Sequence, residues 1–239
     1  MKEKILKITY LILNVGFVAL YTAKFMAITF QLILGQVQAD SILNSGGATP
    51  VLELLICVVG ICALFLPKIV EKIVKGFKLP LFMRYYVMLY IFSALFLGEL
   101  MDVYNLVPIW DSILHAGGGV IFVYVSVVLL REGNKLSPFK LCLFAFSLSA
   151  LLGMLWEVFE FSGDSIFGTN MQRYIASDGT VLIGHEALID TMKDILLDIG
   201  GSFISALAIY RVIKSEKKSK TFEVQYQQIS ENDTILREL

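Results

Sequence analysis

Carboxylate and histidine side chains recur at helical spacing in the second half of the chain. The groups are Asp111 with His115, Glu157 with Glu160, and Asp190 with Asp194 and Asp198. Residues three or four positions apart share one face of a helix, so each group presents its polar atoms together. Carboxylate oxygens are typical ligands of Mg²⁺, Ca²⁺ or Mn²⁺, and an added imidazole also admits Zn²⁺ or Fe²⁺. The pattern predicts a site that holds a divalent cation or moves protons.

Two overlapping sets of functional residues are expected among these groups. The predicted metal ligands are Asp111, His115, Glu157, Glu160, Asp190 and Asp194, and the predicted catalytic residues are Glu157, Glu160 and Asp194. Such a set can activate a bound water, with one carboxylate acting as general base. Simpler roles are open for three members. Asp111 and Asp190 could cap helix N-termini, and His115 could be a packing residue.

The composition indicates the environment of these side chains. The chain has 239 residues, of which 56% are hydrophobic and 17% charged, and its mean hydropathy is +0.73. Soluble domains are about 45–50% apolar and about 25% charged, so the chain is typical of a multi-pass membrane protein rather than a soluble enzyme. A net charge of −1 provides no basic field to attract nucleic acid, which is not expected as a partner.

Six apolar stretches are long enough to cross a bilayer, which takes about 20 helical residues. They cover residues 5–23, 51–70, 81–100, 113–130, 139–161 and 189–213. We therefore expect an all-α bundle of about six transmembrane helices. Residues 1–214 would form the bundle, and residues 215–239 a mobile polar cytoplasmic tail. Residues 25–34 could extend the first helix or lie in the interface.

Positive charges predict the orientation of these helices. Of the 20 Lys and Arg residues, all but Lys24, Arg173 and Lys193 lie near the N-terminus, beside the second–third or fourth–fifth connection, or in the tail. Because Lys and Arg concentrate on the cytoplasmic side, both termini are predicted to be cytoplasmic. The expected location is the bacterial cytoplasmic (inner) membrane, with membrane lipids as partners.

With this orientation, the acids of the last four helices gather at the extracytoplasmic side. The remaining acids there are Glu99, Asp102, Asp164, Asp178 and Glu186, which we interpret as solvated loop residues. A charge at the bilayer centre costs at least about 2.5–3.5 kcal/mol, so the deeper acids must face the bundle interior. Because bases are scarce, a cation or shared protons must neutralise them. Glycines 117–119 and 200–201 follow these acids and predict close packing of the fourth and sixth helices.

Three blocks of sequence carry a family resemblance. They are Trp110-Asp111-Ser112-Ile113-Leu114-His115 with Gly119, Trp156-Glu157-Val158-Phe159-Glu160, and Asp190-Thr191-Met192-Lys193-Asp194 with Gly201. Over about residues 111–202, the chain resembles the YjdF-type family of uncharacterised bacterial inner-membrane proteins. It is more distantly similar to the VanZ-like family, through the spacing of Asp194, Asp198 and Gly201. The founding members of that family are linked to glycopeptide-antibiotic tolerance, so this resemblance implies envelope chemistry outside the cytoplasmic membrane.

Three functions are compatible with these observations. The first is a divalent-cation-dependent enzyme acting on a lipid or lipid-linked envelope precursor in the outer leaflet. The second is a proton- or ion-coupled transporter, because acids and His within spans form proton relays. The third is a non-catalytic membrane assembly factor whose acids pair helices. We favour the first, because the acids gather at one end of the bundle rather than at the midplane, where carriers usually bind.

Overall fold

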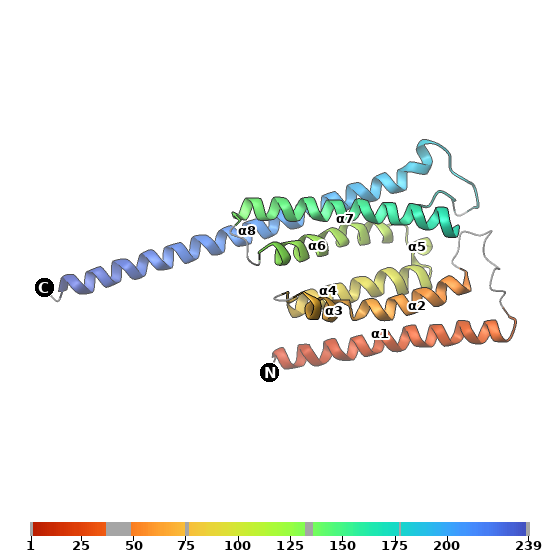
Figure 1. Cartoon of the computed structure of the whole chain (residues 1–239), viewed down its shortest axis with the longest axis horizontal. Helices are drawn as coiled ribbons and strands as arrows, with labels where there is room; N and C mark the ends of the chain where they lie inside the picture. The colour runs from red at the N-terminus through yellow and green to blue at the C-terminus, as the bar shows by residue number, and fades with distance from the viewer. Residues whose placement is uncertain (1, 37–48, 75–76, 132–135, 177, 238–239) are drawn as a thin grey trace.

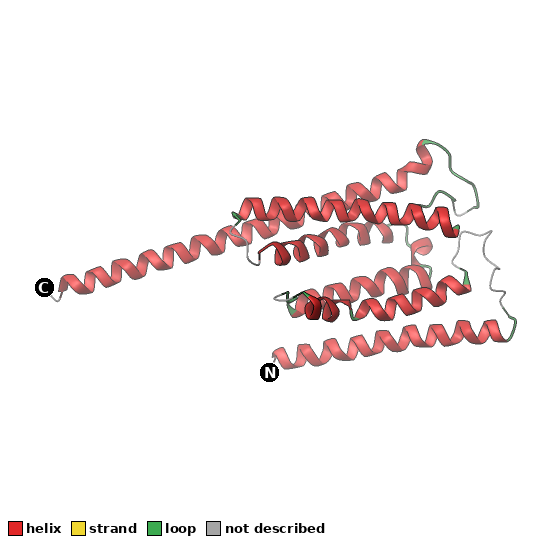
Figure 2. Ribbon diagram, in the orientation of Figure 1, coloured by secondary structure: helices red, strands yellow, loops and turns green. Residues whose placement is uncertain are grey.

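The computed structural model describes residues 2–36, 49–74, 77–131, 136–176 and 178–237, with side chains up to residue 217. This part of the chain consists of helices and loops (Figures 1 and 2). The helices are α1 (Lys2–Ile33), α2 (Pro50–Leu64), α3 (Leu66–Ile73), α4 (Leu81–Ile91), the π-helix η1 (Phe92–Leu100), α5 (Val103–Leu106), α6 (Trp110–Arg131), α7 (Pro138–Phe167) and α8 (His185–Arg237). The all-helical architecture confirms the predicted fold class.

Five helices are long and apolar enough to cross a membrane, and α2 with α3 makes a sixth span if this bent pair is counted as one. The pair is bent by 51°. The bend follows Phe65, because Pro67 at the start of α3 lacks an amide hydrogen and its ring crowds the carbonyl four residues back. The predicted span over residues 51–70 is therefore not one straight helix. The first span is longer than residues 5–23, since α1 continues to Ile33.

The helices form two groups (Figure 1). In the first group, Tyr21 of α1 packs edge-on against Phe96 of η1, within an apolar core shared by α1, α2, α4 and η1. In the second, an apolar core that includes Val123 and Ala145 joins α6, α7 and α8. A third apolar cluster, which includes Met83 of α4, connects α4 to α6. The second group carries most of the predicted site.

Glycines bring the backbones of α6 and α8 into contact. A Cβ atom on Gly119 would lie 2.7 Å from the amide nitrogen of Ser202, and one on Gly201 would overlap the carbonyl oxygen of Ala116. No larger residue fits at either position without separating the helices. The close packing predicted for the fourth and sixth spans is therefore confirmed. It directs the polar faces of α6 and α8 toward each other and toward α7.

Both chain termini lie at the same end of the bundle, and α8 extends beyond that end (Figure 1). The α8 backbone is helical to Arg237, so residues 215–237 prolong the sixth span. The mobility of residues 215–239 stays a prediction. Many large apolar side chains on the outward faces of the helices are exposed, such as Ile12 at 64% and Leu196 at 65%. In a membrane protein these side chains contact lipid.

Candidate functional site

His115 lies at the centre of a polar cluster formed by α6, α7 and α8. Its Nε2 atom is 3.5 Å from Asp111 Oδ1 and 4.0 Å from Asp194 Oδ2. Its Nδ1 atom is 3.3 Å from Asp198 Oδ2 and 3.8 Å from Glu157 Oε1. Each ring nitrogen therefore faces its own pair of carboxylates, and in each set of three residues the possible ligand atoms lie within 4.8 Å of one another. We call these five residues the His115 cluster.

The His115 cluster is withdrawn from solvent. The exposed fractions are 1% for Asp194, 4% for Glu157, 5% for Asp198, 6% for His115 and 9% for Asp111. Among the described residues, neither carboxylate oxygen of Glu157 has a hydrogen-bond partner, and neither does Oδ1 of Asp194. Buried polar atoms are nearly always paired, because an unpaired one bears the full cost of losing water. These are oxygen atoms that a cation or an added proton would satisfy.

Two basic side chains form the rim of the cluster. Arg173 Nε lies 3.8 Å from both Asp111 Oδ2 and Asp190 Oδ2. Lys193 Nζ lies 3.1 Å from Asp190 Oδ1 and 3.6 Å from Asp194 Oδ1. The Arg173 and Lys193 side chains are 30% and 40% exposed, whereas the Asp111 and Asp194 side chains that they pair with are buried. The two bases therefore lie between these carboxylates and solvent. Both bases serve one side of the imidazole, and in the described part of the chain no Lys or Arg pairs with the Nδ1-side carboxylates.

The loop between α7 and α8 is organised by two polar side chains. The Asp164 carboxylate accepts hydrogen bonds from the amides of Met171 at 2.7 Å and Gln172 at 3.0 Å. The Asn170 side chain donates to the carbonyl of Ile175 at 2.8 Å and accepts from its amide at 2.9 Å. Interpreting Asp164 as a merely solvated acid was therefore wrong, because its carboxylate folds the loop.

This loop holds Arg173 over the cluster. Arg173 has a φ of +50°, a left-handed conformation that is unusual for a residue with a side chain. Its Nη1 donates to the carbonyl of Tyr104 at 3.4 Å, and its guanidinium lies 5.6 Å from the centre of the Tyr104 ring. Burial raises the pKa of the Tyr104 phenol, so this ring stays neutral beneath the guanidinium.

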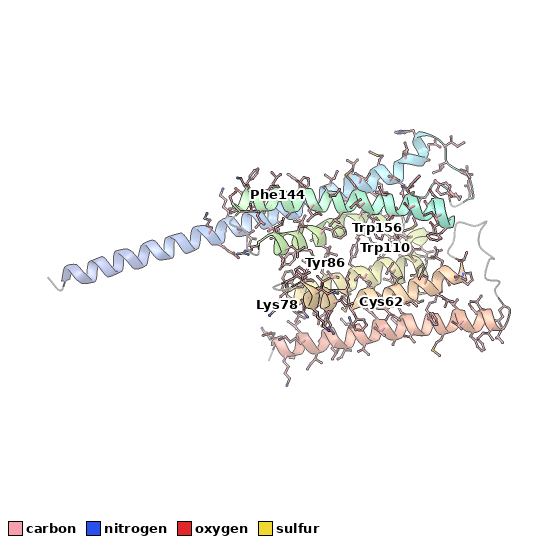
Figure 3. All side chains as sticks on the ribbon, in the orientation of Figure 1. Cys62, Lys78, Tyr86, Trp110, Phe144 and Trp156 are labelled. Atoms are coloured by element: carbon pink, nitrogen blue, oxygen red, sulfur yellow. The ribbon has the colours of Figure 1, made fainter. Side chains whose placement is uncertain are left out.

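The predicted site residues occupy three different positions. Four of them lie in the His115 cluster: Asp111, His115, Glu157 and Asp194. Asp190 lies at the rim, paired with Lys193 and Arg173. Glu160 is buried but accepts a hydrogen bond from Trp156 Nε1 at 2.8 Å and belongs to neither ligand set (Figure 3 labels this tryptophan). The ligand and catalytic roles of all six residues stay predictions.

Asp198 is the cluster member that lies outside the predicted set. Its position was signalled in the sequence by the four-residue steps from Asp190 to Asp198. In the structure, Gly153 of α7 faces it. A Cβ atom on Gly153 would lie 2.6 Å from Asp198 Oδ2. The capping alternative is wrong for Asp190, whereas Asp111 lies in the first turn of α6, where a carboxylate suits the helix dipole without being the N-cap residue. Helix α6 begins at Trp110 and α8 at His185, so Asp111 and Asp190 lie inside their helices.

The two sides of the imidazole differ in charge. Asp111 and Asp194 have Arg173 and Lys193 within 4 Å, whereas the described contacts give Glu157 and Asp198 only the imidazole. A neutral imidazole donates from one nitrogen and accepts at the other. If Nε2–H is directed at Asp111, the Nδ1 lone pair faces Glu157 and Asp198. This arrangement can hold a divalent cation between two carboxylates and one imidazole, with a carboxylate orienting the other ring nitrogen.

The fold and this cluster define an all-helical, multi-pass membrane protein with a buried His/Asp/Glu group. Residues 17–215 match the family model described as "Predicted membrane protein (DUF2238)", and the chain belongs to this family. It is 28% identical over 149 residues to an uncharacterized protein of Thermotoga maritima, an alignment that covers 62% of this chain and 71% of the relative. No solved structure matches the chain. The His115 cluster lies entirely within the residues that the family model covers.

Proposed function

We propose that the protein is a membrane-embedded, divalent-cation-dependent enzyme that acts on a lipid or lipid-linked precursor. The observation that carries the proposal is the pair of buried Glu157 oxygens, which have no hydrogen-bond partner among the described residues and of which Oε1 lies 3.8 Å from His115 Nδ1. Glu157, His115 Nδ1 and Asp198 are the protein ligands. Nitrogen–oxygen separations of 3.3 and 3.8 Å suit neighbouring ligands around one cation, because each bond is about 2.0–2.2 Å long.

Two further carboxylates have supporting roles in this proposal. Asp111 accepts the Nε2 hydrogen of His115 and so fixes the tautomer that turns Nδ1 to the cation. Asp194, whose Oδ1 accepts no hydrogen bond among the described residues but lies 3.6 Å from Lys193 Nζ, would serve as the general base for a water at the site. A bound cation supplies the positive charge that makes such a water nucleophilic at neutral pH.

The substrate and location follow from topology and resemblance. The positive-inside distribution of Lys and Arg directs the cluster to the extracytoplasmic leaflet, with both termini cytoplasmic. The bacterial relative and the resemblance to the YjdF-type and VanZ-like families support the bacterial cytoplasmic membrane as the location. The rim formed by Arg173 and Lys193 is partly exposed and lies beside helices whose outer faces contact lipid. This position favours a substrate that reaches the site from the bilayer.

The packing favours an enzyme over a transporter. On the side of Asp198 away from the rim, the buried Ser149 and Ser202 hydroxyls share a hydrogen bond of 2.7 Å. Beyond them, α6, α7 and α8 close on an apolar core that includes Val127, Leu141 and Ala206. A carrier needs polar access from both sides of the membrane, and the buried residues described in this core include no titratable side chain. The two Glu157 oxygens, which accept no hydrogen bond among the described residues, also argue against an assembly factor. In a protein whose acids only hold helices together, these oxygens would be expected to accept hydrogen bonds from a neighbouring helix.

Cation content tests the proposal directly. Purified full-length protein would be equilibrated with Mg²⁺, Mn²⁺ or Zn²⁺, desalted, and analysed by elemental mass spectrometry beside Glu157→Gln and Asp198→Asn. We expect about one retained cation in the wild type and a loss of retained cation in both variants. Glu186→Gln and His185→Ala are matched controls, because both residues are exposed at the start of α8. A wild type that retains no cation, or variants that retain as much as the controls, would refute the site.

Activity is the second part of the test. Cation-loaded protein would be incubated with total bacterial lipid extract, and lipid products would be identified by mass spectrometry. Product formed by the wild type and His185→Ala, but not by Asp194→Asn, supports the enzyme. A cation-loaded wild type that changes no lipid in the extract contradicts the enzymatic part and leaves the cation site standing.

A further inference from the structure

Helix α3 presents three distinct faces. Pro67 is buried and Glu71 is turned toward the protein. Leu66, Ile69 and Ile73 lie at helical spacing along a second face, and their exposed fractions are 49%, 45% and 73%. The third face carries Lys68 and Lys72, which are four residues apart and exposed. An exposed apolar face beside a basic face is typical of a helix that lies in a membrane interface.

A hydrogen-bonded clamp fixes the rotation of α3. Glu71 Oε1 accepts the amide of Leu79 at 2.8 Å, and Glu71 Oε2 accepts Arg84 Nη2 at 2.8 Å. Arg84 Nε in turn donates to the carbonyl of Leu79 at 3.0 Å. The clamp neutralises the single acid of α3 on its protein-facing side. The outward surface of the helix is therefore purely basic and apolar.

The position of α3 matches this surface. The helix turns away from α2 by 51°, so it leaves the direction of the span instead of continuing it. Lys78, labelled in Figure 3, is exposed at the same end of the bundle. The basic face thus lies where a bilayer presents its headgroups, and the apolar face lies beside it.

We infer that α3 is an interfacial docking helix whose lysines bind the headgroups of anionic phospholipids. Lys68 and Lys72 pair with lipid phosphates, while Leu66, Ile69 and Ile73 enter the acyl boundary. The surface potential of anionic lipids attracts each nearby Lys with an energy equivalent to about a fivefold change in binding constant at physiological ionic strength. This site is separate from the His115 cluster and does not depend on the proposed enzymatic function.

Lipid selectivity of the full-length protein tests this inference. Phosphatidylglycerol or phosphatidylcholine would be titrated into detergent-purified protein, and bound lipids would be counted by native mass spectrometry. We expect the wild type to prefer phosphatidylglycerol. The Lys68→Gln/Lys72→Gln double variant should lose affinity for that lipid by about 25-fold, the product of two fivefold effects. Salt at about 0.5 M should weaken the wild-type preference, because screening then acts within a few ångströms.

A matched double variant removes the same charge elsewhere. Lys140→Gln/Lys214→Gln replaces two exposed lysines at the first turn of α7 and on α8, and we expect it to keep the preference. Ile73→Ser keeps both lysines and should weaken retention of either lipid, since it shortens the apolar face. Equal loss in the two double variants would mean that only general surface charge matters. That result, or an unchanged preference in Lys68→Gln/Lys72→Gln, would overturn the proposal.

Discussion

Gly153→Ala should disable the proposed cation site without changing any charge. The new Cβ atom would lie 2.6 Å from Asp198 Oδ2 and 2.8 Å from both the Cβ and the Cγ of Asp198. Carbon–oxygen contacts are normally no shorter than about 3.3 Å, so the carboxylate must retreat by roughly 0.7 Å. Because Asp198 Cβ is crowded as well, rotation of the carboxylate alone cannot relieve the overlap, and α7 and α8 must separate.

The expected loss follows from the tolerance of cation sites. Ligand distances in such sites hold to about ±0.2 Å, so a shift of roughly 0.7 Å removes Asp198 as a ligand. We expect cation affinity to fall at least about 10–100-fold, the range seen even when only supporting residues are disturbed. Overpacking of α7 against α8 should also lower the free energy of unfolding by about 1–3 kcal/mol.

The assay is cation titration by isothermal calorimetry on detergent-purified protein, with unfolding followed in parallel. Gly200→Ala is the matched control, because a Cβ atom there meets nothing within 4 Å and the residue lies two positions from Asp198 on α8. If Gly153→Ala binds the cation as tightly as Gly200→Ala, then Asp198 is not a ligand and the assignment of the Nδ1 side is wrong.

Three further predictions concern the base, the helix contact and the loop. Asp194→Asn should retain the cation but lower turnover by about 10²–10⁴-fold, measured on whichever lipid the wild type converts. Gly201→Ala should lower the free energy of unfolding by about 1–3 kcal/mol in detergent, because its Cβ would overlap the Ala116 carbonyl oxygen, whereas Gly16→Ala meets nothing and should not. Asp164→Asn should speed hydrogen exchange at the amides of Met171 and Gln172, which donate hydrogen bonds to the Asp164 carboxylate. Unchanged exchange would show that the loop is held by other contacts.

The sequence predicts the helices well, because membrane spans are encoded by long apolar runs that need no tertiary information. The bend after Phe65 was the exception, since the apolar run continues through it and only Pro67 marks the break. The close approach of α6 and α8 was also readable, because only glycine permits backbone contact. Gly119 and Gly201 carry that signal.

The composition of the site was only partly predictable. Glu157 and Glu160 are three residues apart, about 60° around the helix from each other, and the sequence does not show which of them faces the neighbouring helices. In the structure Glu157 faces His115, and Glu160 turns to Trp156. The cluster contains Asp198, which was not predicted, and lacks Glu160, which was. Asp198 faces His115 because the contact between Gly201 and Ala116 sets the rotation of α8. Asp164 lies in the last turn of α7, four residues after Glu160, and this spacing does not reveal that its carboxylate accepts hydrogen bonds from the following loop.

In the proposed site, cation binding would be coupled to the packing of one helix group. Glu157 and Asp198 lie on α7 and α8, and among the described contacts only the imidazole of α6 opposes their charge. Without a cation or proton, their repulsion acts directly against the glycine contacts that hold these helices together. A cation at about 100 times its dissociation constant would stabilise the bound state by about 2.7 kcal/mol, so chelation should loosen α6, α7 and α8 first. The group formed by α1, α2, α4 and η1 has its own apolar core and should respond less, because no member of the cluster lies in it.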